Sequence, residues 1–220
     1  MNKNFFVERK LEAVEKALTR LSPFASNCCL CPRHCRVDRI SGHTGICQTG
    51  DQARVSTSLL HFGEEPVLSG QGGAGKVGGS GTIFFAGCSL KCLFCQNYQL
   101  SWLNQGHPVS DEQLASFMLK LQAQGALNIN LVSPTHVVIP ILRALKIAYA
   151  RGLTIPIVYN SNGYDSIEVI EELRGIIDIY LPDLKYVSSE LSKKYSAAPD
   201  YFEQARLAIQ EMYCQQPELI

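Results

Sequence analysis

The sequence has little net charge and no long apolar run. Its 20 Lys and Arg residues balance 20 Asp and Glu residues, so the chain offers no basic stripe to attract a phosphate backbone. The N-terminus, MNKNFFVERK, carries charges where a signal peptide needs an apolar core, and no apolar stretch is long enough to span a bilayer. These features predict a cytoplasmic protein with no nucleic-acid or membrane partner.

Cysteine, by contrast, is abundant, with nine residues in 220. Disulfides are rare in the cytoplasm, so we expect reduced thiols. Most of the cysteines fall into two clusters with short gaps, a pattern typical of metal ligands. The candidate ligands are Cys28, Cys31, Cys35 and Cys47 in the first cluster and Cys88, Cys92 and Cys95 in the second.

The chain divides into three segments, 1–24, 25–80 and 81–220. The first is an N-terminal helix, because its apolar residues recur at helical spacing until Pro23 stops it. The second holds the first cysteine cluster and ends in short strands and a glycine-rich loop. The third alternates apolar strand-like runs with helical patterns, which predicts an α/β fold with parallel strands and right-handed crossovers.

The expected elements of the third segment fit four strand–helix units. The strands are expected at 82–86, 128–132, 155–159 and 177–181, and the helices at about 110–124, 137–151, 165–174 and 199–213. Ser110 and Gln113 predict a capping box, Gly152 a helix C-terminus and Asp165 a helix N-cap. In such folds the chemistry lies at the carboxyl ends of the strands.

The glycine-rich loop contains a motif that resembles a nucleotide-binding fingerprint. Gly70 to Gly75 fit G-x-G-x-x-G, and Lys76 follows as in a phosphate-binding loop. A fingerprint of this kind follows a strand and opens a helix, whereas this loop precedes a strand. Val77 also stands where the magnesium-binding hydroxyl belongs. We therefore expect a flexible connection and no nucleotide site.

The three-cysteine loop has the spacing C-x3-C-x2-C just past the first strand of the third segment. Three thiolates on a four-iron cluster leave one iron without a protein ligand, and an open position is what a catalytic metal keeps for its substrate. With Phe94 before the last cysteine, GSGTIFFAGCSLKCLFCQNYQ resembles the radical S-adenosylmethionine superfamily. HFGEEP, NINLVSPTH, PIVYNSNGY, DIYLPDLKY and CCLCPRHCRVDR resemble its branch related to pyruvate formate-lyase activating enzyme.

This resemblance implies an enzyme that binds a [4Fe–4S] cluster and cleaves S-adenosylmethionine reductively to a 5′-deoxyadenosyl radical. It also implies an electron donor of the flavodoxin or ferredoxin type. Among the substrates that the resemblance allows is a glycine residue of a partner protein, which would become a glycyl radical. Relatives use a partial barrel of about six strand–helix units, against eight in a full barrel. With four units, the chain is expected to form a partial barrel that lacks its last strands, leaving strand 177–181 at an open edge.

The resemblance assigns further residues to the S-adenosylmethionine site. These are Ser133 and Thr135 after the second strand, Asn160 and Asn162 after the third, and Asp183 and Lys185 after the fourth. Asn160 replaces the usual acid, which puts a bound cation in doubt. His136 is either an acid–base group or a wall residue of the site. Glu64 and Glu65 have no role that the sequence reveals.

The first cysteine cluster lies in a short loop that cannot build an apolar core of its own, so a metal is expected to hold it together. Four thiolates suit either zinc or a second iron–sulfur cluster. Cys29 is expected to be the odd thiol between ligands, and Cys214 a free one. The alternative to an enzyme is a non-catalytic metal-binding module or degenerate relative.

Overall fold

The computed structural model describes residues 3–70 and 78–218. The elements are α1 (Lys3–Leu21), α2 (Pro23–Ser26), β1 (Ala53–His61), α3 (Pro66–Ser69), β2 (Ser80–Phe85), α4 (Tyr98–Ser101), β3 (His107–Val109), α5 (Asp111–Ala123), β4 (Ile129–Val132), the 3-10 turn η1 (Thr135–Val137), α6 (Val138–Ala150), β5 (Ile157–Ser161), α7 (Ile167–Glu172), β6 (Ile179–Pro182), α8 (Ser189–Ser196) and α9 (Tyr201–Gln215).

A six-stranded sheet in the order β3-β1-β2-β4-β5-β6 forms the centre of the molecule. The strands β2, β4, β5 and β6 run parallel, with Thr82, Asn130, Val158 and Ile179 in register across them. This part confirms the predicted alternation of strands and helices. The antiparallel β1, from the cysteine-rich segment, pairs with β2 and carries β3 on its other side.

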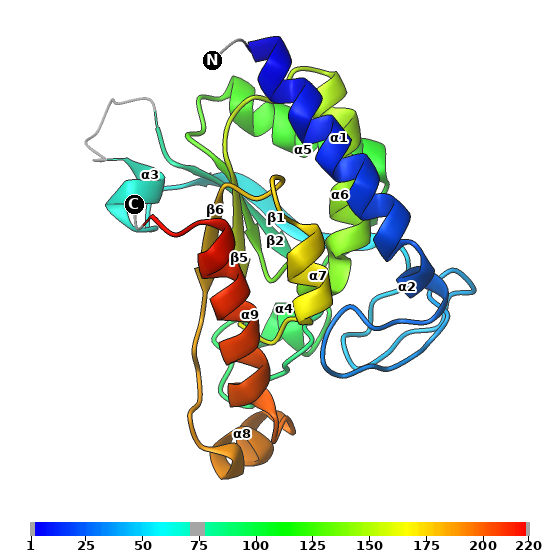
Figure 1. Ribbon diagram of the computed structural model, residues 1–220. Coiled ribbons are helices and arrows are strands. Elements are labelled where there is room, and N and C mark those ends of the chain that lie inside the picture. The colour runs from blue at the N-terminus through cyan, green and yellow to red at the C-terminus, as the bar shows by residue number, and fades with distance from the viewer. Residues whose placement is uncertain (1–2, 71–77, 219–220) are drawn as a thin grey trace.

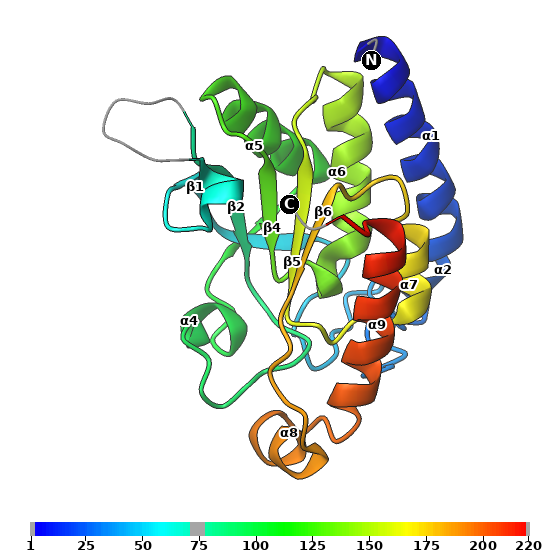
Figure 2. The same cartoon turned by 60° about the vertical axis from the view of Figure 1, so that its left-hand side comes forward.

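Helices cover one face of this sheet. In Figures 1 and 2, α1, α5 and α6 pack together on one side, with α7 and α9 beside them. Their buried apolar residues form one core with Ile83, Leu131 and Ile157 of the strands. The cysteine-rich loop that follows α2 lies at the same end of the molecule as α4 and α8.

Two of the three predicted helix boundaries are confirmed. Ser110 accepts a hydrogen bond from the backbone N–H of Gln113, whose side chain accepts one from Ser110 N, so the capping box is present. Gly152 follows the C-cap of α6 with φ +94°, a conformation that favours glycine. The prediction for Asp165 is wrong, because α7 begins after Ser166. The Asp165 carboxylate is buried and accepts from the Tyr159 hydroxyl.

Several parts of the fold lie beyond the sequence-based expectations. The short elements α3, α4, β3 and α8 were not expected. The glycine motif falls mainly in 71–77, outside the described residues, and closure of the sheet into a partial barrel stays a prediction. Within the part of the chain that the structure describes, no helix combines the length and apolar character needed to cross a bilayer.

Lys10 fastens α1 to the amino ends of β5 and β6. Its buried ammonium donates to the Asp178 carboxylate and to the Ile176 carbonyl, at 2.7 Å each, and burial lowers the pKa of Lys10. The other oxygen of Asp178 accepts from the backbone N–H of Ile157 at 2.9 Å. One ion pair thus ties a helix from the start of the chain to two strands.

We expect Lys10→Met to lower the free energy of unfolding by about 3 kcal/mol, because it leaves a half-buried carboxylate without its cation. Urea unfolding measures the change. Lys16→Met, at an exposed position of the same helix, is the matched control and should leave stability almost unchanged. Equal stability of the two variants would contradict the assignment.

Candidate functional site

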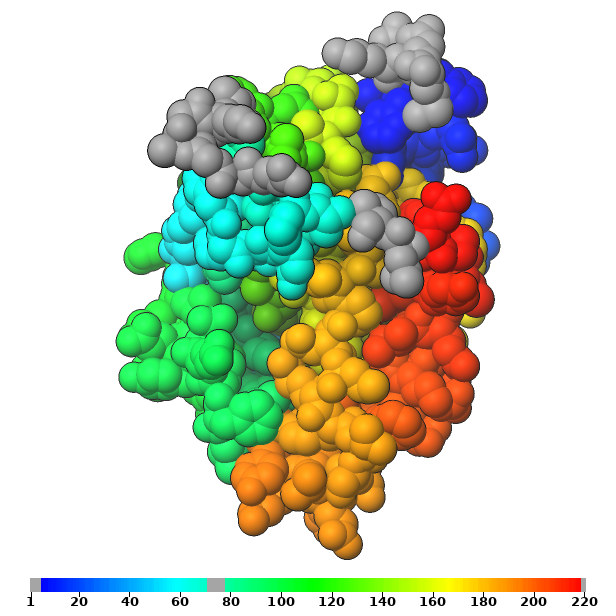
Figure 3. Space-filling model, turned by 90° about the vertical axis from the view of Figure 1, so that its left-hand side faces the viewer, coloured from blue at the N-terminus to red at the C-terminus, as the bar shows by residue number. Residues whose placement is uncertain are grey.

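A cavity of about 440 Å³ opens at the carboxyl ends of the parallel strands. Figure 3 shows this side of the molecule hollowed between the cyan β1–α3 segment, the green α4 region and the orange β6–α8 segment. All four strand-end loops contribute to its wall. The polar and thiol groups in the lining are Cys88, Cys92, Cys95, Gln96, Asn97, Ser101, Ser133, Asn160, Ser161, Asn162, Asp183 and Lys185. The volume is within the range of small-ligand sites.

The loop that carries the three thiols begins at Gly87, where β2 ends. A Cβ atom on Gly87 would lie 2.5 Å from the Cys47 carbonyl oxygen and 2.6 Å from Thr49 Oγ1, and φ is +87°. Glycine is therefore required here for the loop to pass under the cysteine-rich segment. Further along, Trp102 Nε1 donates to the Cys92 carbonyl at 2.9 Å and Leu93 N donates to Tyr195 O at 2.8 Å.

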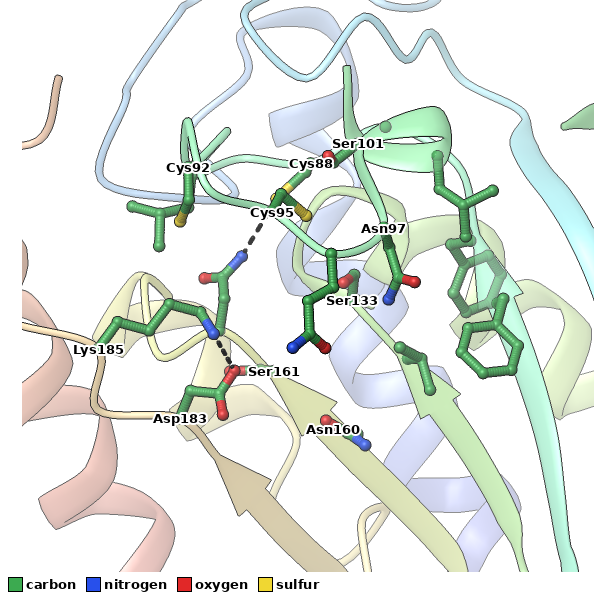
Figure 4. Close-up of a pocket in the computed structure, with 18 of the residues that line it drawn as sticks. Cys88, Cys92, Cys95, Asn97, Ser101, Ser133, Asn160, Ser161, Asp183 and Lys185 are labelled. Carbon is green, nitrogen blue, oxygen red and sulfur yellow. Dashed lines mark hydrogen bonds and ion pairs between the residues drawn. The ribbon is translucent and has the colours of Figure 1, made fainter. Parts of the chain in front are cut away.

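Cys88, Cys92 and Cys95 line the same cavity, the first two buried and the third half-buried (Figure 4). All nine cysteines are among the described residues and all are free thiols. Burial raises the pKa of Cys88, so the thiol stays protonated until a metal takes the proton's place. Three thiols on one loop are the donor set that iron–sulfur clusters use, and the chemistry of the loop therefore fits such a group.

In residues 3–70 and 78–218, no three His, Cys, Asp or Glu side chains are arranged to hold a metal ion as they stand. Metal binding of thiols is coupled to loss of their protons and to local ordering. That arrangement concerns a single ion, whereas the cysteines of a four-iron cluster each bind a different iron and need not converge on one centre.

Asn162 faces the thiols from the end of β5. Its Nδ2 lies 3.5 Å from Cys88 Sγ, and its Oδ1 accepts from Tyr164 N at 2.9 Å. At the next position, a Cβ on Gly163 would fall against the Asp183 carbonyl, so glycine lets the β5 and β6 loops touch. Tyr201 of α9 joins the same loops, donating to Asn162 O at 2.8 Å and accepting from Lys185 N at 2.9 Å.

Asp183 and Lys185 lie on the opposite side of the cavity from the thiols. Their side chains form an ion pair at 2.7 Å, with the carboxylate 55% and the ammonium 29% exposed (Figure 4). A pair this accessible to water is weak, so both charges are available to a ligand. Asn160 lies between this pair and Ser133, and its backbone carbonyl accepts a hydrogen bond from the Ser133 N–H at 2.9 Å.

The turn after β4 splits into residues that line the cavity and residues that do not. Ser133 lines it, with a left-handed backbone at φ +58°. Thr135 and His136 are buried behind it in η1. His136 Nε2 lies 2.9 Å from the Ala86 carbonyl, and burial lowers the pKa of His136 to about 4. The ring is therefore neutral and donates from Nε2 to the Ala86 carbonyl, which holds the end of β2 from behind the cavity.

The first cysteine cluster borders the site. Cys28, Cys31 and Cys47 are buried and Cys35 is half-buried; burial, with a smaller contribution from its three neighbours, raises the pKa of Cys31. The buried guanidinium of Arg39 connects this cluster to the turn after β4. Its Nη2 lies 3.3 Å from Cys47 Sγ, and its Nη1 donates to His136 O at 2.6 Å.

Two glutamates that the sequence singled out lie apart from the thiols. Glu64 Oε1 accepts from Asn130 Nδ2 at 3.0 Å and so holds the β1–α3 turn on β4. Glu65 is exposed at the start of α3. Sequence reasoning missed Arg39 and Tyr201, since their partners lie far away along the chain. The one signal that pointed to Arg39 was its place among the cysteines.

The neutral state of His136 predicts a pH-dependent stability. Because the ring is neutral when folded and protonates near pH 6.5 when unfolded, stability is lost as pH falls from 6.5 to about 4. Relative to His136→Asn, which keeps a donor but does not titrate, the wild type should lose about 3 kcal/mol over this interval in urea unfolding. His43→Asn, at an exposed histidine, should follow the wild type. Parallel curves for wild type and His136→Asn would show that the ring is not held neutral.

Comparison with known proteins finds a curated relative of this chain. The chain is 33% identical over 186 residues to an uncharacterized protein of Methanocaldococcus jannaschii, covering 80% of this chain and 51% of the relative. The chain thus spans about half the length of that relative. No solved structure matches the chain.

A family model described as the radical SAM superfamily matches residues 82–213. The matched residues include most of β2, all elements from α4 to α8, most of α9, and all four strand-end loops of the cavity. The match covers more than half of the chain, and the chain therefore belongs to the radical SAM superfamily.

Proposed function

We propose that the chain binds a [4Fe–4S] cluster through Cys88, Cys92 and Cys95 and uses it to cleave S-adenosylmethionine for hydrogen-atom abstraction. Superfamily membership implies both cofactors. The observation that carries the residue assignment is that the three thiols share one cavity with the charged and amide groups of the other strand ends. Held by Cys88, Cys92 and Cys95, a reduced cluster would supply the one electron that cleavage of S-adenosylmethionine to methionine and a 5′-deoxyadenosyl radical consumes.

The charged groups of the cavity complement the two charges at the methionine end of S-adenosylmethionine. Lys185 matches its carboxylate and Asp183 matches its ammonium group. Asn160 and Asn162 supply amides that both donate and accept hydrogen bonds, and Ser133 supplies a hydroxyl. The apolar part of the wall consists of Phe84, Phe85, Leu90, Phe94, Leu100 and Val132. A contact between Thr135 and the ligand stays a prediction, because this residue lies outside the lining.

The narrower form of the proposal is that the hydrogen atom comes from a glycine of a partner protein, with a flavodoxin- or ferredoxin-like protein as electron donor. Its support is the resemblance of the strand-end segments to those of activating enzymes. The second candidate is a metal-binding protein without catalysis, favoured by Asn160 in place of an acid and by the lack of glycines in the turn at Ser133. Formation of 5′-deoxyadenosine separates the two.

We further propose that Cys28, Cys31, Cys35 and Cys47 bind zinc or a second iron–sulfur cluster. The support is that all four thiols are buried or half-buried in one loop. Cys28, Cys35 and Cys47 lie close enough to Cys31 to contribute to its raised pKa. Cys29 has a different position, since its carbonyl accepts from Ser166 Oγ at 3.1 Å while its thiol stays half-buried.

Changing Cys88, Cys92 and Cys95 to Ala together should remove about four irons per chain after anaerobic reconstitution with iron and sulfide. Formation of 5′-deoxyadenosine from S-adenosylmethionine under a chemical reductant should fall to the level without protein. Cys214→Ala, at an exposed lone thiol, is the control and should keep both iron and product. Full iron content in the triple variant would contradict the assignment of the cluster to these three cysteines. Full iron content without 5′-deoxyadenosine formation in the wild type would favour the non-catalytic alternative.

The triple variant also tests the first cluster, since any zinc or iron that it still holds must bind elsewhere. We expect this residual metal to disappear when Cys31 and Cys47 are changed to Ser as well, and to persist when Cys29 is changed instead. Elemental analysis measures the metal. Because metal binding orders such a loop, its loss should also lower the melting temperature. A triple variant that holds neither zinc nor iron would show that the first cluster is not a metal site.

A further inference from the structure

One arginine of the cysteine-rich segment reaches into the loop of the three thiols. Arg33 lies between Cys31 and Cys35 in the sequence. Its Nε donates to the Ser89 carbonyl at 3.0 Å, and its Nη2 donates to the Leu90 carbonyl at 3.1 Å. Both acceptors lie between Cys88 and Cys92, and both residues are buried. Few other donors can reach carbonyls that are shielded from water, so their position depends on the guanidinium.

The same guanidinium binds two further segments. Its Nη2 donates to the Ser196 carbonyl at 2.6 Å and its Nη1 donates to the Ala197 carbonyl. These are carbonyls at the C-terminus of α8, where a cation is favoured. The plane of the group also lies over the Tyr164 ring, 5.2 Å from its centroid, next to the Asn162 turn. One side chain therefore joins the thiol loop, α8 and the end of β5.

The position of Arg33 is fixed in turn by the loop of the first cysteine cluster. Backbone hydrogen bonds run from His34 N to Cys31 O at 3.0 Å and from Arg36 N to Cys28 O at 2.9 Å. His34 and Arg36 both have left-handed backbones, with φ +41° and +53°. Such conformations persist for residues other than glycine only where the surroundings hold them. A metal on Cys28, Cys31 and Cys35 would hold this loop in place.

A second contact joins the two cysteine loops from the other end. Cys47 and Thr49 pack directly on Gly87, the residue before Cys88. Arg39 fixes this side, through its contacts with Cys47 Sγ and His136 O. The thiol loop is thus bounded by the cysteine-rich segment at Gly87 and again at Ser89 and Leu90.

We propose that the cysteine-rich segment is a clamp that sets the geometry of the radical-forming loop, with Arg33 as its positioning residue. The state of the first cysteine cluster is thereby coupled to the three thiols: when the first cluster is loaded, Arg33 holds the carbonyls between Cys88 and Cys92 where the iron site needs them. This regulation rests on the proposed function, because it supposes that the three thiols hold the iron site.

Hydrogen–deuterium exchange tests the clamp in the full chain as purified, before iron is added to the three thiols. The amides of Leu93 and Cys95, bonded to Tyr195 O and Cys92 O, report on the thiol loop. Arg33→Ala should speed their exchange about tenfold, the size of one or two lost hydrogen bonds. Arg33→Lys should do the same, because an ammonium keeps the charge but cannot span four carbonyls.

The controls separate the clamp from general stability. Arg36→Lys and Arg36→Ala change an exposed arginine of the same loop and should leave exchange at Leu93 and Cys95 as in the wild type. Amides of α6 are the internal reference for global unfolding. Changing Cys31 and Cys35 to Ser should reproduce the effect of Arg33→Ala on the thiol loop. If Arg33→Ala unfolds the chain, the exchange of Arg33→Lys tests the clamp instead, because lysine keeps a cation on an aliphatic stem.

A spectroscopic readout distinguishes positioning from mere support. After reconstitution, Arg33→Lys should bind as much iron as the wild type but give an altered electron paramagnetic resonance spectrum of the reduced cluster, whereas Arg36→Lys should give the wild-type spectrum. Unchanged exchange in both Arg33 variants, or in the Cys31 and Cys35 variant, overturns the clamp. The exchange result stands even where the thiols bind no iron, so failure of the proposed function is seen separately in the iron content.

Discussion

The site depends on a close approach of two backbones at Gly87. With no side chain there, the Cys47 carbonyl, the Thr49 hydroxyl and the His136 ring all come within reach of the end of β2, where any Cβ atom would collide with them. This contact places the cysteine-rich segment on top of the parallel strands. The same contact brings the His136 ring against Gly87, and the ring is buried and neutral there. A larger residue at Gly87 would separate two segments that lie about forty residues apart in the sequence.

The opposite wall is held by α9. Tyr201 bonds the loops that follow β5 and β6, and its ring meets Tyr186 edge-on with centroids 5.2 Å apart. The same aromatic cluster includes Tyr164, over which the Arg33 guanidinium lies. An aromatic cluster thus supports the cavity from outside its lining, while the charged pair within the lining, Asp183 and Lys185, stays near solvent. Two of the three thiols, Cys88 and Cys92, are buried, whereas the charged groups are exposed enough to change partners.

Much of the fold follows from local sequence signals, and much of the site does not. The four parallel strands were predictable because each is a short apolar run between helical patterns, and the cavity because parallel strands share one carboxyl edge. The prediction for Asp165 failed because an acid just before a helical pattern is typical of an N-cap. In the structure its carboxylate accepts instead from Tyr159 and Ser161 on the preceding strand. The role of Arg33 could not be predicted from the residues around it in the sequence, since its hydrogen-bond acceptors lie 56 to 164 residues away. Helix α8 was missed because it is short and largely polar.

The chain has a single tryptophan, and the structure places it on the thiol loop. The Trp102 indole donates to the Cys92 carbonyl, and the Lys91 ammonium lies 5.3 Å from the centre of its ring. Everything that moves this loop therefore moves the one indole of the protein. An iron–sulfur cluster bound at the three thiols would also lie close enough to quench the fluorescence of this indole. Tryptophan fluorescence, excited apart from the nine tyrosines, consequently reports on this loop and can be followed during cluster assembly without any label.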